Sequence, residues 1–152
     1  MNDRSLIYIA YPMTPEEPLI KESVKQIAAG LRESNFDVYV PDEFVKLSWL
    51  HNIASCEKVA HLVWELDRTM IMQAEGLIAF AGQPSTGVGI EIGIAWQRNI
   101  PILVLSTGDN DIVSELLIGM FLTEEHVFHG VLGETIGLEG IVKLFKRKDQ
   151  SI

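Results

Sequence analysis

A continuous apolar run, then a glycine-rich turn and a helical pattern, occupies residues 76 to 95 and constrains the fold more than any other feature. The run Gly76 to Ala81 is short and has no polar interruption, which predicts a strand buried on both faces of a parallel sheet. Four residues of special backbone geometry follow: Gly82, Pro84, Gly87 and Gly89. Glycines let a backbone come close to a ligand. From about Val88 apolar residues continue in a helical pattern, so we expect a strand–turn–helix unit with a ligand-accessible turn.

Glu91 is the one charged residue in the first turns of this expected helix. The dipole and free amide groups at a helix N-terminus stabilise a carboxylate as the anion, and an anionic carboxylate facing a crevice can act as a nucleophile. A glutamate at this position is also common for the dipole effect alone. The glycines add little, because G-V-G is neither the full dinucleotide fingerprint nor a P-loop, and no lysine follows to hold phosphates. The local pattern therefore leaves a catalytic and a structural glutamate both open.

Strand and helix patterns alternate along the whole chain. Strands are predicted at 6–10, 38–40, 76–81, 100–105 and, more weakly, 127–128; helices are predicted at 16–34, 55–73, about 88–99, 111–120 and 140–146. This alternation predicts one α/β domain over residues 1–152, a flavodoxin-like (Rossmann-type) three-layer sandwich. The five-stranded parallel sheet should have the order 2-1-3-4-5, because right-handed crossovers then cover both faces. That order brings together the carboxyl ends of the first and third strands, so Tyr8 and the turn 83–91 should share one crevice.

Asp67 stands out in the expected helix 55–73, because it lies near a stripe of apolar residues that should be buried. That stripe comprises Val59, Leu62, Val63, Leu66, Met70 and Ile71. A carboxylate that is even half-buried needs a hydrogen-bonding partner. Asp67 either makes a structural hydrogen bond to a loop or faces the same crevice as Glu91. The preceding segment, Glu43 to about Ser55, is expected to cover that crevice with short helical pieces.

Composition excludes several classes of protein. A formal net charge of -9 and a pI near 4.8 argue against a nucleic-acid polymer or a membrane surface as partner. Cys56 is the one cysteine, so no intrachain disulfide can form. The four histidines lack the spacing of a metal site, and His126 and His129 are expected in loops or on the surface. No signal-peptide or membrane-span pattern is present, so the expected location is cytoplasmic.

The stretch Q-P-S-T-G-V-G-I-E-I-G-I-A, residues 83–95, with Ile7-Tyr8-Ile9 and Leu66-Asp67, resembles the nucleoside 2-deoxyribosyltransferase superfamily. It is most similar to the nucleotide N-glycosidase branch, the 2'-deoxynucleoside 5'-phosphate N-hydrolases and the CMP and hydroxymethyl-CMP hydrolases. The resemblance implies that Glu91 is the nucleophile, that Tyr8 orients it, and that Asp67 is a carboxylate near sugar and base. It also implies the substrate-binding residues: Ser85, Gly87 and Gly89 near the 5'-phosphate, Ser114 from a neighbouring subunit, and Met13. Met13 lies in the loop after the first strand, where Pro12 and Thr14 replace the serine or arginine common in that branch.

The implied activity is hydrolysis of the base–sugar bond of a (deoxy)ribonucleoside 5'-monophosphate. Cleavage of this bond builds positive charge at C1', which a carboxylate stabilises or captures, and needs a proton for the departing base. An anionic Glu91 and a proton-sharing Asp67 would divide these roles, with no metal and no cofactor. The resemblance also implies a homodimer or larger homo-oligomer with a shared site. Base exchange by a deoxyribosyltransferase and a non-catalytic nucleotide-binding module are the alternatives.

Overall fold

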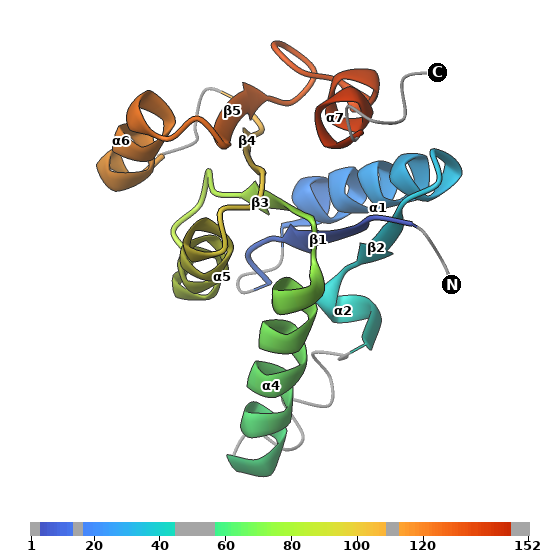
Figure 1. Cartoon of the computed structure of the whole chain (residues 1–152), viewed down its shortest axis with the longest axis vertical. Coiled ribbons are helices and arrows are strands. Elements are labelled where there is room, and N and C mark those ends of the chain that lie inside the picture. The colour runs from blue at the N-terminus through green and yellow to red at the C-terminus, as the bar shows by residue number, and fades with distance from the viewer. Residues whose placement is uncertain (1–3, 14–16, 45–56, 109–112, 147–152) are drawn as a thin grey trace.

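The computed structural model of the chain describes residues 4–13, 17–44, 57–108 and 113–146, in which strands and helices alternate (Figure 1). The strands are β1 (Leu6–Ala10), β2 (Asp37–Tyr39), β3 (Gly76–Phe80), β4 (Ile102–Ser106) and β5 (Val127–Val131). The helices are α1 (Pro18–Glu33), α2 (Pro41–Phe44), α4 (Glu57–Gln73), α5 (Thr86–Gln97), α6 (Glu115–Thr123) and α7 (Leu138–Phe145). Most of the segment predicted to cover the crevice, residues 45–56, lies outside the described residues.

All five strands pair in one parallel sheet with the order β2-β1-β3-β4-β5, so the predicted strand order is confirmed. Every residue of β3 and β4 is buried. Their continuous apolar runs suit strands that are covered on both faces. Ala10 at the end of β1 lies opposite Ala79 of β3, so the two strands end together at the carboxyl edge of the sheet.

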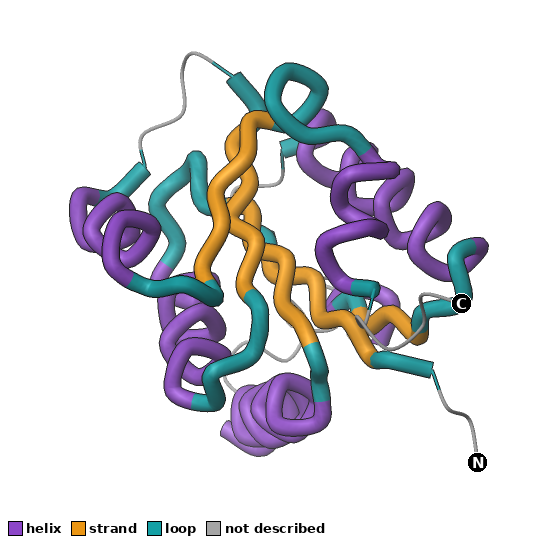
Figure 2. Tube along the Cα trace, turned by 45° about the horizontal axis from the view of Figure 1, so that its top comes forward, coloured by secondary structure: helices purple, strands orange, loops and turns teal. Residues whose placement is uncertain are grey.

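Two hydrophobic layers cover the two faces of the sheet, because successive side chains of a strand point to opposite faces. Ile7 and Ile9 of β1 pack in the layer under α1 and α7, whereas Tyr8 and Ala10 pack in the layer under α4 and α5. Figure 2 shows the strands between these groups of helices. The three-layer α/β fold is therefore confirmed, and its two faces separate residues that alternate in the sequence.

The predicted apolar face of the helix 16–34 comprised Leu19, Val24, Ile27, Ala28 and Leu31; in α1 the last four are buried, and only Leu19 is wrong. Leu19 is 80% exposed and Ile20 is 5% exposed. The spacing of the helix explains the difference, because Ile20 lies one turn before Val24, which continues through Ile27 to Leu31. A similar error affects α4, where Leu62 of the predicted buried stripe is exposed and Ile71 is buried. Figure 1 shows the amino-terminal half of α4 extending beyond the sheet.

The helix after the central turn begins at Thr86, two residues earlier than predicted. Ser85 is its N-cap, and the Ser85 hydroxyl accepts a hydrogen bond from the backbone N–H of Val88. Gly87 and Gly89 therefore lie within α5 and are not turn residues. Open space surrounds the position that a Cβ of Gly89 would occupy. These glycines leave two positions in the first turns of α5 without a side chain.

The described helices include none that is long and apolar enough to cross a membrane.

Candidate active site

Tyr8 and Glu91 form the central polar contact of the site. Tyr8, in the middle of β1, is completely buried, and its hydroxyl donates a 2.6 Å hydrogen bond to Glu91 Oε1. Glu91 is half-buried in the second turn of α5, whose N-terminus follows the carboxyl end of β3. The short donor–acceptor distance is typical of a hydroxyl bonded to a carboxylate. The strand order thus brings together two residues that are far apart in the sequence, as predicted.

Tyr39 and Asp67 form a second tyrosine–carboxylate pair beside the first. The Tyr39 hydroxyl donates to Asp67 Oδ1 at 2.9 Å. Tyr39 and Tyr8 are register partners in β2 and β1, and their ring centroids lie 5.2 Å apart. The sequence analysis predicted that Asp67 needs a partner but missed Tyr39. The register of β2 against β1 would have revealed it, because opposite residues in neighbouring strands share one face.

Burial raises the pKa of both carboxyl groups. For Glu91, desolvation and the nearby charge of Asp67 outweigh the Tyr8 hydrogen bond and raise the pKa to about 7. For Asp67, desolvation raises the pKa, and the Tyr39 hydrogen bond opposes the rise. The expectation that Glu91 is stabilised as the anion is therefore wrong, because burial raises its pKa more than the helix N-terminus lowers it. Glu91 lies beyond the first turn of α5, where the dipole effect is strongest, and inside a layer where desolvation dominates.

Asp67 and Glu91 line one cavity of about 370 Å³ between α4 and α5, called the carboxylate cavity below. Gly87 also lines it, and much of the remaining wall is apolar: Val63, Trp64, Ile71, Ile90 and Ile94. A few polar groups in an apolar cavity are typical of a small-molecule site. Carboxyl groups with raised pKa values, held from two helices in such a cavity, can take part in proton transfer, and the pKa of Glu91, about 7, lies near neutral pH.

Ser85, Gly89 and Ser114 line a second cavity of about 320 Å³, called the serine cavity below. Ser85 caps α5 and Ser114 caps α6, where the Ser114 hydroxyl accepts from the backbone N–H of Leu116. Both serines thus have a structural role at a helix N-terminus, a position that also suits an anion. Of the five predicted substrate-binding residues, these three lie together and Gly87 lies in the carboxylate cavity. Ser114 was expected from a neighbouring subunit, but the Ser114 that lines this cavity belongs to the same chain as Ser85. Met13 lines neither cavity and packs in the layer under α1 and α7.

No cluster of histidine, cysteine or acidic side chains able to hold a metal ion occurs within the described ranges. His129 lies in β5 and not in a loop, although its side chain is exposed as predicted. Its Nε2 atom is 3.2 Å from the Ser106 hydroxyl, and its ring stacks on Phe121. His126 is half-buried between α6 and β5. Both histidines lie at the far end of the sheet order from Tyr39, so they contribute nothing to the carboxylate cavity.

The fold and the paired carboxyl groups define an α/β protein with a candidate site beside the carboxyl edge of a parallel sheet. Residues 7–139 match the family model described as nucleoside 2-deoxyribosyltransferase. The match spans most of the chain, so the protein belongs to the nucleoside 2-deoxyribosyltransferase family, enzymes that act on the N-glycosyl bond of nucleosides and nucleotides.

Two solved structures are similar in fold. The CMP N-glycosidase BcmB of Clostridium botulinum is 20% identical with a TM-score of 0.58, and the alignment covers 91% of this chain and 96% of that one. A conserved protein from Enterococcus faecalis V583 is 22% identical with a TM-score of 0.56, and the alignment covers 95% of this chain and 89% of that one. A search of curated proteins finds no match.

Proposed function

We propose that the protein hydrolyses the base–sugar bond of a (deoxy)ribonucleoside 5'-monophosphate, with Glu91 as the nucleophile at C1'. The observation that carries this proposal is the 2.6 Å hydrogen bond from Tyr8 to Glu91 at the wall of a cavity that Asp67 also lines. Tyr8 orients one carboxyl oxygen, which leaves the other available to a substrate. The substrate would place C1' against that oxygen in the carboxylate cavity.

The chemistry uses the two carboxyl groups in turn. The ionised Glu91 attacks C1' and the C1'–N bond breaks, so its electron pair leaves with the base. The departing base takes a proton from a protonated Asp67 or from water. Water then attacks C1' and the bond between C1' and Glu91 breaks, which releases the sugar phosphate and regenerates the Glu91 carboxylate; the proton that the water loses returns to Asp67 or to solvent. A pKa of about 7 leaves Glu91 partly ionised at neutral pH. Because the charge of Asp67 contributes to that rise, the two carboxyl groups titrate as a pair, and the reacting form is the one in which Glu91 is ionised and Asp67 holds the shared proton.

The serine cavity supports a 5'-phosphate as part of the substrate. The two hydroxyl groups of Ser85 and Ser114 and the N-terminus of α5 can donate hydrogen bonds to phosphate oxygens. The overall charge of -9 repels an anion, so such a site must act locally. Phosphate binding would help to hold C1' against Glu91. The similarity of fold to a CMP N-glycosidase is consistent with this substrate class.

A panel of nucleosides and 5'-monophosphates tests the proposal by release of free base. We expect kcat/KM to be substantially higher for a monophosphate than for the matching nucleoside, with no exchanged product when a second base is added. Faster turnover of the nucleoside, with the second base captured on the sugar, would establish base exchange instead. The carboxylate cavity serves either reaction, so only the acceptor would change.

A pair of substitutions at Ser85 tests the phosphate contact without removing the helix cap. Asparagine and aspartate are both good N-cap residues, so Ser85→Asn and Ser85→Asp should keep α5 intact. Ser85→Asp adds a negative charge to the serine cavity and should raise KM for the monophosphate by about tenfold or more. The same variant should leave KM for the nucleoside close to that of Ser85→Asn. An equal change in KM for the monophosphate and the nucleoside would show that the serine cavity does not bind the phosphate.

Oligomerisation and a cytoplasmic location remain predictions. Several large apolar side chains are exposed on α4, α5 and α6, and a second copy could cover them: Leu62, Trp64, Ile90, Trp96, Leu116 and Leu122. Light scattering on the purified protein measures the subunit number, and a monomer that releases base at the full rate would contradict the shared-site prediction. Cell fractionation tests the location.

A further inference from the structure

Two neighbouring strands hold the two tyrosine hydroxyls of the site. Tyr8 and Tyr39 face the same side of the sheet because they are register partners in β1 and β2. Tyr8 reaches Glu91 on α5, and Tyr39 reaches Asp67 on α4. Each carboxyl group of the carboxylate cavity therefore has its own tyrosine donor, and the proposed function uses only the donor to Glu91.

We propose that Tyr39 is a positioning residue for Asp67: its hydroxyl fixes one carboxyl oxygen and so aims the other oxygen at the nucleoside. A carboxylate accepts hydrogen bonds at both oxygens, so a donor at Oδ1 leaves Oδ2 for the substrate. The proposal rests on the proposed function, because it requires that Asp67 act in the cavity. It concerns a different carboxyl group from the one that Tyr8 orients.

Burial makes Tyr39 a dependable donor. Its side chain is 1% exposed and belongs to the layer under α4 and α5. Desolvation and the charge of Asp67 raise the pKa of the Tyr39 hydroxyl well above its usual range, so the hydroxyl keeps its proton under all assay conditions. Holding a half-buried carboxyl group with a fixed donor restricts its rotation, which is what precise placement near a substrate requires.

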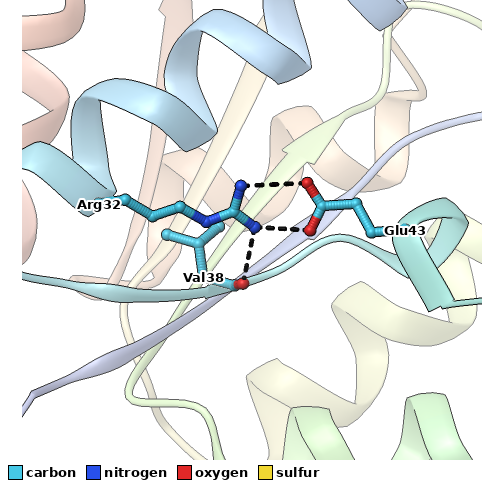
Figure 3. Close-up of polar contacts among 3 residues, drawn as sticks. All are labelled: Arg32, Val38 and Glu43. Atoms are coloured by element: carbon cyan, nitrogen blue, oxygen red, sulfur yellow. Dashed lines mark hydrogen bonds and ion pairs between the residues drawn. The ribbon is translucent and has the colours of Figure 1, made fainter.

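The short helix α2 covers the ring of Tyr39. The Phe44 ring stacks on it with centroids 4.8 Å apart and planes 12° apart. A four-residue helix has too few hydrogen bonds to hold itself in place. Arg32 at the end of α1 holds it: its guanidinium bonds both carboxylate oxygens of Glu43, at 3.1 Å and 2.6 Å, and also donates to the carbonyl of Val38 (Figure 3). These contacts of Arg32 connect α1, β2 and α2 around Tyr39.

The charges around Asp67 determine how its titration responds to Tyr39. Glu91 approaches from α5, the Tyr8 and Tyr39 hydroxyls come from the sheet, and Arg68 lines the same cavity from α4. The Tyr39 hydrogen bond lowers the pKa of Asp67 against the effect of burial. Loss of the hydroxyl should therefore raise the pKa of Asp67. If Asp67 supplies the proton to the base, activity falls as pH rises through this pKa, so the basic limb of the pH profile should move to higher pH.

Tyr39→Phe tests the role, because it removes the hydroxyl and keeps the ring that stacks on Phe44. With a 5'-monophosphate as substrate, we expect kcat to fall by about tenfold or more, as for loss of a hydrogen bond to a charged group. KM should change by less than about threefold, and the basic limb should move to higher pH. An isosteric second variant, 3-fluorotyrosine at position 39, has a more acidic hydroxyl that donates more strongly. It should move the same limb to lower pH.

A double-mutant cycle shows whether Tyr39 acts through Asp67. In the Asp67→Ala background, Tyr39→Phe should cause little further loss of kcat in long-incubation assays of base release. Tyr8→Phe is the matched control, because Tyr8 acts on Glu91, and its loss should persist in that background.

An unchanged kcat and pH profile for Tyr39→Phe would overturn the proposal, as would an equal loss with and without Asp67. A lower melting temperature with an unmoved basic limb would assign Tyr39 to packing alone. If the phenylalanine variant fails to fold, an unmoved limb in the fluorotyrosine variant has the same meaning. Glu91→Gln distinguishes failure of the Tyr39 proposal from failure of the proposed function. If Glu91→Gln loses base release and Tyr39→Phe does not, only the role of Tyr39 is excluded. If Glu91→Gln keeps full activity, the proposed function itself is excluded.

Discussion

Glu91→Gln should abolish base release and, at alkaline pH, make the protein more stable. The carboxyl group has an ordinary pKa of 4.5 when unfolded and about 7 when folded, mainly because burial penalises its charged form. Below pH 4.5 Glu91 is protonated in both the folded and the unfolded state, so it does not lower the free energy of unfolding. As pH rises from 4.5 to about 7, only the unfolded state ionises, so the free energy of unfolding falls. Above about pH 7 the loss is complete.

The size of this loss follows from the rise in pKa. At about 1.4 kcal/mol for each pH unit, a rise from 4.5 to about 7 corresponds to about 3 kcal/mol. Glutamine resembles the protonated carboxyl group and can still accept the hydrogen bond from Tyr8. For a chain of this length, about 3 kcal/mol corresponds to a rise in Tm of about 5–10 °C. The difference in Tm between variant and parent should be near zero below pH 4.5 and constant above about pH 7.

Thermal unfolding of both proteins at several pH values, with base release measured in parallel, checks this prediction. Glu125→Gln, at an exposed turn between α6 and β5, controls for the loss of one negative charge and should leave both quantities almost unchanged. A Glu91 that only favours the helix dipole predicts the opposite sign, a loss of about 0.3–1 kcal/mol at alkaline pH. A less stable Glu91→Gln at about pH 8.5, or retention of more than about a tenth of the rate, would refute the reasoning.

Three further predictions follow from the same contacts. Tyr8→Phe should lower kcat by about ten- to a hundredfold and move the acidic limb of the pH profile to higher pH, because its hydrogen bond lowers the pKa of the nucleophile; an unmoved limb would assign Tyr8 to the core. Asp67→Asn should slow base release by about a hundredfold or more without lowering Tm above neutral pH, whereas an active variant with a lower Tm would indicate a structural hydrogen bond. Gly76→Ala should lower the free energy of unfolding by about 1–3 kcal/mol, because its Cβ would lie 2.5 Å from the buried ring of Phe145. Gly93→Ala, on the open side of α5, should not lower it. Thermal unfolding of both variants measures this, and a Gly93→Ala that is less stable than Gly76→Ala would contradict the packing.

Local sequence patterns were sufficient for the layers of the fold and for placing Tyr8 and the turn 83–91 at one crevice. The uninterrupted apolar run at 76–81 and its counterparts mark strands buried on both faces, and the alternation with helices allows few parallel topologies. Once the order places β1 beside β3, Tyr8 and the start of α5 lie at neighbouring strand ends. The pairing of Tyr8 with Glu91 was what the family resemblance implied, and the structure shows it as a 2.6 Å hydrogen bond.

The second pair and the electrostatics depended on tertiary structure. Tyr39 meets Asp67 only because β2 pairs with β1 in one particular register, and a shift by one residue would turn Tyr39 to the other face. The sequence could not show the raised pKa of Glu91, since a helix N-terminus favours the anion locally while burial between α4 and α5 opposes it more strongly. Hydrophobic periodicity and turn-forming residues act within a few positions along the chain, so they can be recognised in a single sequence. Strand register and desolvation arise from residues that meet only in the folded chain.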